Sequence, residues 1–280
     1  MRDKSDSVRK AIKDIVKRLM DGLMEKVLHS DPFIPEEHHA KKPLYAALVP
    51  DEIFKGSHFE RRFTTPFGRV WEKLALVVAT KKHGNNCRLG ENVEGTIKIE
   101  RLRRIQEVLN NLEHSVDKKN RVRPNWDDEL SHILSGSGDP VPATVTCDLF
   151  IDSQTTEKKY AFELKAPLPN SDQTKVSKEK MFKLLAMEPP PVDEVYYALP
   201  YNPYGKKKDY VWTYPFRWFD MIHDPSVLIG VEFWDLIGGK GTYEIFISEI
   251  NLLGEEYRNR IYREYLGMEP PEQSYDHKLK

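Results

Sequence analysis

The chain has 280 residues, of which 31% are charged and 39% are hydrophobic, so it can bury a core and is not disordered throughout. Its 43 Lys and Arg residues nearly balance 44 Asp and Glu residues, which excludes a binder relying on bulk positive charge but not an enzyme with a local basic surface. The longest apolar run, residues 74–79, is too short to cross a membrane. With no signal peptide and only two cysteines, we expect a cytoplasmic protein with no membrane partner.

The N-terminal part is predicted to be mainly helical. Apolar residues at helical spacing predict an amphipathic helix over residues 7–28, and four prolines predict loops or turns over 31–50. A second helix should begin at Thr65, which can cap it, with a proline in its first turn, and should end near residues 84–86. Its apolar surface predicts a deeply buried helix that carries one acidic residue, Glu72.

The rest of the chain alternates between helical and strand patterns. Helices are predicted over residues 98–113, 126–134, 174–187 and 243–266, and strands over 144–151, 160–166 and 194–199. There is no internal repeat and no linker that forces a split. We therefore expect one domain over residues 1–280.

The two central strands bring charged side chains together. A hairpin that is symmetric about the centre of its turn places Asp148 opposite Glu163, with Cβ atoms about 5 Å apart, and Lys165 shares the face of Glu163. Two such carboxylates repel each other, and Mg²⁺ is a natural compensating cation. Lys165 could hold or help deprotonate a water, or stabilise phosphate charge. Two carboxylates, a divalent cation and a lysine are the components of metal-assisted phosphodiester hydrolysis. Cys147, next to Asp148 in sequence, should point to the opposite face as a core residue.

A salt-bridge cluster on the surface of a hairpin is the alternative explanation of this pattern. Opposed Asp and Glu residues with a lysine nearby are common, and short motifs are weak signals. Two features favour the catalytic interpretation. The charges interrupt strands that are otherwise apolar, which costs free energy, and the next helix is rich in lysine.

Asp148, followed by a strand, a turn and Glu163-Leu164-Lys165, resembles the signature of the PD-(D/E)XK nucleases. Residues 68–75 resemble the GxxxE helix that many of these nucleases carry before the hairpin, although Cys147 stands where the family often has proline. The resemblance implies an α/β fold with a restriction-endonuclease-like core, in which a central mixed β-sheet is flanked by α-helices. It places the catalytic core at about 57–199 in a single nuclease domain, and residues 1–56 and 200–280 would then serve DNA contact or dimerisation.

The resemblance also implies roles for the matching residues. Asp148, Glu163 and the Leu164 carbonyl would bind Mg²⁺, and Lys165 would position or activate the attacking water. Glu72 would be an outer metal ligand or would orient a water. The alternative for Glu72 is a helix glutamate at the edge of the core, paired with Arg69 or Lys73.

Type II restriction endonucleases are the members that the chain resembles most, because it is compact and has no helicase motifs. The segment 195–205 is similar to the TdeIII type, which would imply Mg²⁺-dependent cleavage of double-stranded DNA at a GGNCC-like site. A homodimer and a cognate DNA methyltransferase are further implications. A repair or structure-specific nuclease of the same superfamily and a non-catalytic DNA-binding protein are the alternatives.

Lysines after the hairpin are the first candidates for DNA contact. Lys175, Lys178 and Lys180 lie on the helix that follows it, and we expect the first two to bind DNA. A loop after the third strand adds further candidates, because lysine neutralises phosphates and asparagine can read adenine, although a solvated turn is the alternative. The expected contacts in this loop are Asn202, Tyr204, Lys206 and Lys207. Weaker candidates are Arg101, Arg103, Arg104 and the stretch 118–123.

Overall fold

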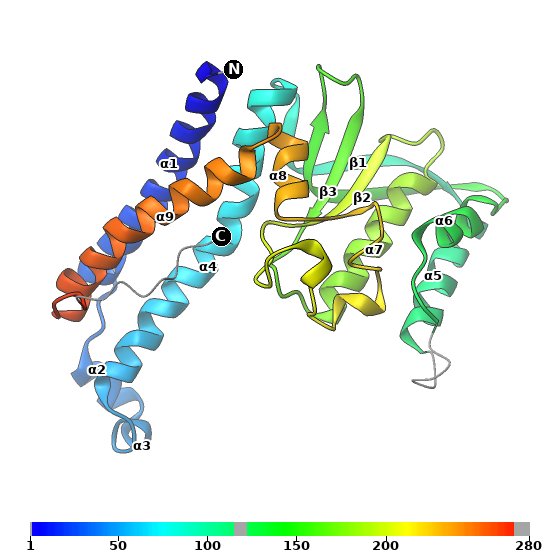
Figure 1. The fold of residues 1–280 in the computed structure, drawn as a ribbon. Coiled ribbons are helices and arrows are strands. Elements are labelled where there is room, and N and C mark those ends of the chain that lie inside the picture. Colours follow the sequence, from blue (N-terminus) through cyan, green and yellow to red (C-terminus); the bar gives the residue numbers. More distant parts are fainter. Residues whose placement is uncertain (1, 115–121, 272–280) are drawn as a thin grey trace. The chain divides into compact units, whose positions relative to one another are not determined.

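The computed structural model describes residues 2–114 and 122–271 (Figure 1). Contacts within the chain form two compact units. The single nuclease domain over residues 1–280 stays a prediction. The first unit contains Met1–Leu74 and Glu244–Lys280, and the second contains Ala75–Tyr243. None of the described helices is long and apolar enough to cross a membrane.

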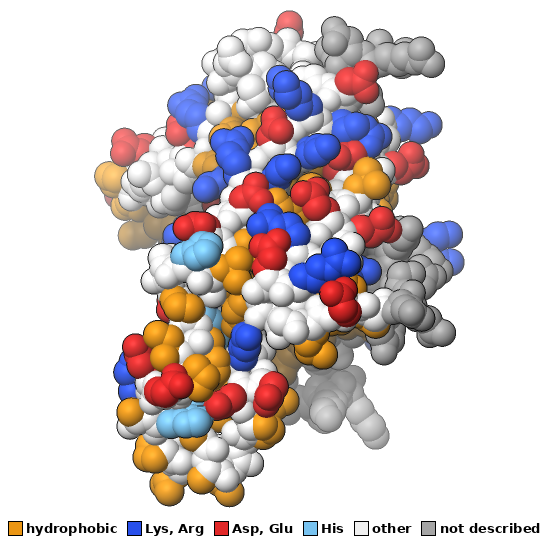
Figure 2. Space-filling model, turned by 90° about the vertical axis from the view of Figure 1, so that its left-hand side faces the viewer, with side chains coloured by type: hydrophobic (Ala, Val, Ile, Leu, Met, Phe, Trp, Pro, Cys, Tyr) orange, Lys and Arg blue, Asp and Glu red, His pale blue; other side chains and the backbone are white. Residues whose placement is uncertain are grey.

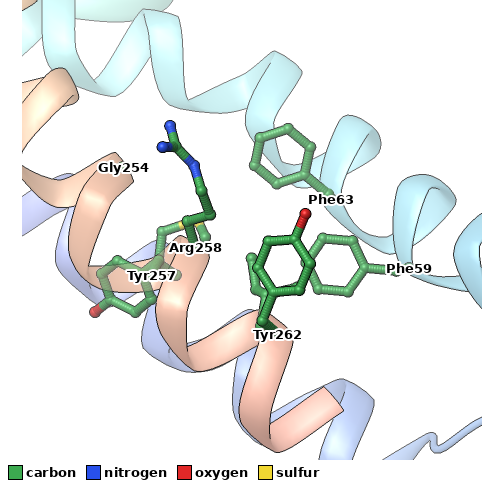
Figure 3. A pocket seen from close by; sticks show the side chains of 8 residues that line it. Phe59, Phe63, Gly254, Tyr257, Arg258 and Tyr262 are labelled. Carbon is green, nitrogen blue, oxygen red and sulfur yellow. The ribbon is translucent and has the colours of Figure 1, made fainter. Parts of the chain in front are cut away.

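The first unit is helical. Its elements are α1 (Arg2–Glu25) with a π-helical turn (Lys26–Ser30), α2 (Pro35–Lys41), α3 (Pro43–Ala46), most of α4 (Asp51–His83), and α9 (Thr242–Arg260) with a second π-helical turn (Ile261–Leu266). α1 and α9 lie side by side, and the hydroxyl of Tyr257 on α9 donates to the carbonyl oxygen of Lys17 over 3.2 Å. A mainly aromatic pocket of about 290 Å³ is lined by Phe59 and Phe63 from α4 and by Tyr262 (Figure 3).

Two predictions for this unit were wrong, and proline accounts for both. The stretch 31–50 was expected to be loop, but Pro35 and Pro43 occupy the first turns of α2 and α3, where a missing N–H costs nothing. α4 was expected to begin at Thr65, but it begins at Asp51 and continues through Pro66. A row of aromatic rings on one face of the helix continues across this proline, from Phe63 through Phe67 to Trp71.

The second unit is built on a five-stranded sheet. In chain order its elements are β1 (Cys87–Lys98), α5 (Ile99–Glu113), α6 (Trp126–Leu134), β2 (Pro140–Asp152), β3 (Lys159–Leu164), α7 (Ser171–Ala186), β4 (Glu194–Leu199), β5 (Val227–Ile229) and α8 (Val231–Gly238). The strands are ordered β1-β2-β3-β4-β5. β1 to β3 pair antiparallel, and β3 to β5 pair parallel. The predicted mixed sheet is therefore confirmed.

Helices cover both faces of this sheet. Glu163 on β3 bonds to side chains of α7, whereas the ring of its neighbour Phe162 lies 5.9 Å from that of Phe233 on α8. Successive residues of a strand point to opposite faces, so α7 and α8 lie on opposite sides. The sheet with flanking helices is the predicted α/β arrangement. The core is formed mainly between the sheet and α5 to α7, and Cys147 is fully buried in it, as predicted.

The sequence pattern did not reveal β1, β5 or α8. β1 is an edge strand whose polar residues Arg88, Glu91 and Glu94 interrupt the apolar pattern. β5 has three residues, which is too short for a periodicity to be recognised. α8 has eight residues and follows β5 after a single residue, so its helical period is also short.

Candidate active site

The hairpin of β2 and β3 brings Asp148 and Glu163 to the same level. Its ladder pairs Leu149 with Phe162, in the register that was predicted from the centre of the turn. One step beyond this pair, the backbone N–H of Leu164 donates a hydrogen bond to Asp148 Oδ2 over 2.8 Å. The predicted convergence of the two carboxylates is therefore confirmed.

Three oxygen atoms surround the ammonium group of Lys165. Its Nζ lies 2.7 Å from Asp148 Oδ2, 3.3 Å from Glu163 Oε2 and 3.0 Å from the carbonyl oxygen of Leu164. A cationic atom thus already sits among three hard oxygen donors, the ligand type that Mg²⁺ prefers. No cluster of three or more Asp, Glu, His or Cys side chains within 2–114 and 122–271 could hold a metal. The two carboxylates and the carbonyl, completed by water, fit a Mg²⁺ ion.

α7 supplies two further groups that hold Glu163. Its side chain is 2% exposed and accepts hydrogen bonds from Lys180 Nζ over 2.8 Å and from Ser177 Oγ over 3.2 Å. Neither group was predicted to contact Glu163. Ser177 and Lys180 are three residues apart and share a helix face, but their partner could not be identified without the packing of α7 on the sheet.

The electrostatics of the cluster are set by burial and by mutual charge. Burial raises the pKa of Glu163 above its ordinary value, and the neighbouring Asp148 raises it further. Burial acts to lower the pKa of Lys165, but the Glu163 and Asp148 carboxylates outweigh it and raise this pKa above its ordinary value. Lys165 is therefore an ammonium at neutral pH. Two carboxylates and two lysines form a compensated group in a part-buried site.

Glu72 lies on α4, where it is half-buried. It belongs to the first unit, whereas Asp148, Glu163 and Lys165 belong to the second. Its role as an outer ligand remains a proposal.

Of the two lysines of α7 expected to bind DNA, Lys178 is not at the surface. It is 0% exposed, its Nζ lies 2.5 Å from Glu129 Oε2, and it donates to the carbonyl oxygen of Trp218. A side chain without exposed surface cannot contact DNA in this conformation, so this expectation is corrected. Lys175 is partly exposed, and its Nζ lies 2.5 Å from Glu113 Oε2.

In the loop after β4, two residues that were expected to contact DNA, Asn202 and Lys207, bind other groups of the protein instead. Asn202 is buried, and its side chain donates to the Lys206 carbonyl oxygen over 2.6 Å and accepts from the Tyr204 N–H over 2.9 Å. Lys207 Nζ lies 3.0 Å from Glu232 Oε2. Because its amide is used within the loop, Asn202 is not placed to read a base. Tyr204 and Lys206 are exposed.

The weaker arginine candidates for DNA contact differ in how exposed they are. Arg101 is buried, with an ion pair of 2.6 Å to Glu188, and Arg104 lies 2.9 Å from Glu100. Arg103 is exposed. Positions 118–121 of the predicted basic stretch lie outside the described residues.

Comparisons with known proteins identify the family of the chain. A family model described as type II restriction endonuclease, HinfI, matches residues 8–254. The type II restriction enzyme HgiCII of Herpetosiphon aurantiacus is 25% identical over 231 residues, which are 80% of this chain and 82% of that protein. HgiEI and HgiBI of the same organism are 25% and 24% identical over 212 residues, 72% of this chain and 73% of each.

The matches confirm the restriction-endonuclease-like fold class, and they lend no support to the narrower TdeIII resemblance of residues 195–205. A match over most of the sequence, together with the convergence of Asp148, Glu163 and Lys165, leads to one conclusion. The chain belongs to the HinfI family of type II restriction endonucleases, which are site-specific endodeoxyribonucleases.

Proposed function

We propose that the protein hydrolyses phosphodiester bonds of double-stranded DNA with Mg²⁺ held by Asp148, Glu163 and the carbonyl oxygen of Leu164. The observation that carries this proposal is the set of three oxygen atoms within 3.3 Å of one cationic nitrogen. Bound Mg²⁺ would polarise the phosphate and lower the pKa of a water that attacks it. Lys180 and Ser177 would keep the Glu163 carboxylate oriented toward the metal.

Lys165 would position or activate the attacking water in this reaction. Without a bound cation the adjacent carboxylates raise its pKa, and Mg²⁺ bound to these same carboxylates would oppose that rise. As an ammonium beside the reacting phosphate, Lys165 would stabilise the negative charge that develops on it. Glu72 would orient a water in the outer shell, as the family resemblance implies.

Plasmid DNA incubated with Mg²⁺ tests the proposal. Wild-type protein should give discrete fragments, and Lys165→Ala or added EDTA should abolish them, whereas Lys158→Ala, an exposed lysine of the same hairpin, should cleave normally. Fragment ends would show whether the site is GGNCC-like, which we propose from the resemblance of residues 195–205. A smear would favour the repair or structure-specific nuclease. Tight DNA binding without cleavage would favour the non-catalytic alternative.

We further propose that the protein acts as a homodimer. Each chain carries one catalytic cluster, and a symmetric pair of chains suits cleavage of both strands of a symmetric site. Hydrophobic side chains gather over α2 and α3 (Figure 2), where Leu44 and Leu48 are 78% and 81% exposed. Sedimentation should show a dimer that Leu44→Glu/Leu48→Glu converts to monomer. A monomeric wild type at micromolar concentration would contradict this proposal.

Cytoplasmic action beside a cognate DNA methyltransferase completes the proposal, because host DNA must be protected from a site-specific nuclease. Methylation of the cleaved sequence should block cleavage in the plasmid assay. Equal cleavage of methylated and unmethylated plasmid would argue against such a partner.

A further inference from the structure

The first unit has a small polar pocket between α2 and the N-terminal half of α4. Its volume is about 110 Å³. Two phenylalanines, Phe33 and Phe54, form its apolar part. The polar side chains that line it are His38, Lys42, Ser57, His58, Arg61 and Arg62. Basic and imidazole groups therefore dominate the lining, and no acidic residue contributes to it.

Arg62 is the one lining arginine with a counterion in the described structure. Its guanidinium lies 2.7 Å and 2.6 Å from Asp31 Oδ2 through Nε and Nη2, and Nη1 donates to the His58 carbonyl oxygen over 3.3 Å. Within residues 2–114 and 122–271, neither Lys42 nor Arg61 has an ion pair or side-chain hydrogen bond. Two positive charges at the pocket thus lack a counterion from the described protein.

Two buried imidazole nitrogens also lack partners. Nε2 of His38 and Nε2 of His58 make no hydrogen bond to any described residue. The nearest carboxylate oxygen to the second, Asp31 Oδ1, is 3.7 Å away, too far for a hydrogen bond. The ring of His38 is held against Phe54, with centroids 4.1 Å apart. Buried polar atoms of this kind are normally satisfied by an ion or a water.

The tautomer of His58 follows from its neighbours. The Tyr265 hydroxyl donates to the Lys55 carbonyl oxygen over 2.8 Å, so the His58 Nδ1 atom, 3.2 Å from that hydroxyl, must donate to its oxygen. Nε2 of His58 then carries a proton only in the imidazolium form. Burial and the charge of Arg62 lower the pKa of His58, so at neutral pH its Nε2 is an unprotonated acceptor. The unpaired donors available to an anion are therefore those of Lys42 and Arg61.

The pocket has room for a small anion. Its volume of about 110 Å³ is sufficient for a tetrahedral oxyanion. A phosphate group presents several oxygens, which suit the separate donors of Lys42 and Arg61.

We propose that this pocket binds one phosphate group of the DNA backbone, with Lys42 and Arg61 neutralising its charge. The proposal rests on the proposed function in one respect, since that function makes DNA the source of the phosphate. Such a contact is independent of base sequence and would help to position the duplex. It adds a DNA-contacting site in the first unit, where the sequence analysis assigned no individual residue to DNA.

Two measurements on the full chain test the proposal, with Lys42→Ala/Arg61→Ala as the variant. The matched control is Lys10→Ala/Lys13→Ala, which removes two exposed lysines of α1 outside the pocket. The first measurement is thermal unfolding against inorganic phosphate concentration. The second is the affinity for a duplex of arbitrary sequence without Mg²⁺, measured over a range of salt concentrations.

Phosphate should raise the melting temperature of wild type and control but leave that of the variant unchanged. The slope of log K against log salt should become shallower by about 1 in the variant alone, as expected for one lost phosphate contact. Asp31→Asn should tighten phosphate binding severalfold, because it frees Arg62.

Two outcomes would decide against the proposal. Phosphate stabilisation lost in the variant with an unchanged salt slope would make the pocket a free-anion site and overturn the DNA assignment. Identical behaviour of variant and control in both measurements would show that no phosphate site exists. Plasmid cleavage by wild type is recorded separately: absent cleavage with the expected slope change would reject the proposed function and leave the phosphate site standing.

Discussion

Replacing Lys178 with methionine tests most directly whether this lysine is structural. Its side chain is fully buried, and its ammonium is bonded to Glu129 and to the carbonyl oxygen of Trp218. The ring centroids of Phe219 and Phe182 lie 4.9 and 5.3 Å from Nζ. The variant should therefore lose stability and keep its affinity for DNA.

The expected loss follows from the state of Glu129 after the substitution. Removing one partner of a buried ion pair costs about 3–5 kcal/mol, because the remaining charge is uncompensated. Methionine retains most of the buried methylene surface and Glu129 can take up a proton, so we expect a loss of about 2–4 kcal/mol at pH 7. Lys183→Met is the control on the same helix. Its pair with Glu179 is partly exposed and should be worth less than about 1 kcal/mol.

The loss should also depend on pH. Burial raises the pKa of Glu129 above its ordinary value of 4.5, and the charge of Lys178 opposes this rise. Without Lys178, folded Glu129 holds its proton more tightly than the unfolded chain does. The variant is then most stable below the unfolded pKa, and it loses stability as pH rises toward the folded one. Its deficit relative to wild type should be larger at pH 8 than at pH 5.

Urea unfolding followed by circular dichroism at both pH values measures this deficit, and duplex binding without Mg²⁺ measures DNA affinity. Glu129→Gln combined with Lys178→Met should recover part of the lost stability, because the unpaired carboxylate is gone. A Lys178→Met protein that unfolds at the wild-type urea concentration but binds DNA severalfold more weakly would refute the buried placement.

Three further predictions concern other parts of the chain. A Cβ on Gly136 would lie 2.8 Å from a backbone nitrogen of α5, so Gly136→Ala should cost about 1–3 kcal/mol in urea unfolding. Gly22 in α1 has open space around it, so Gly22→Ala should gain about 0.5–1 kcal/mol in the same assay. Equal effects of the two substitutions would contradict the packing around Gly136. Burial raises the pKa of Cys147 to about 12, so an alkylating reagent at pH 8 should modify this thiol only when urea has unfolded the protein. Mass spectrometry measures the modification, and a modified Cys147 in the native protein would disprove the prediction. The hydrogen bond from Arg62 lowers the pKa of Asp31, so the Asp31→Asn variant should lose at most about 1 kcal/mol of stability at neutral pH. Its melting curve should converge with that of wild type as pH falls below 3.8. A difference in melting temperature that stays constant with pH would exclude the Asp31 carboxylate as its cause.

Local signals in the sequence were sufficient for several elements. The helix predicted over 126–134 and the strand predicted over 194–199 have the observed bounds Trp126–Leu134 and Glu194–Leu199. Asn125 caps that helix by accepting from the Asp128 N–H, which is a short-range interaction. Helices and strands of this kind are encoded by residues within a few positions of one another.

Signals that depend on distant residues were absent or misleading. β1 escaped detection because its character as a strand comes from pairing with β2, along which its polar residues remain exposed. Asn202 looked like a base reader because the pattern could not show that its amide closes its own loop. Ser177 and Lys180 acquire their role only through Glu163, on a different element.

The sequence by itself determined that Asp148, Glu163 and Lys165 meet. The position of the turn sets the register of β2 and β3, and this register alone brings Asp148 beside Glu163 and Lys165. Only the tertiary structure decided which lysines face solvent. Lys178 is buried because α6 and the residues around Trp218 close over it, and packing between segments far apart in the chain leaves no periodic pattern in the sequence.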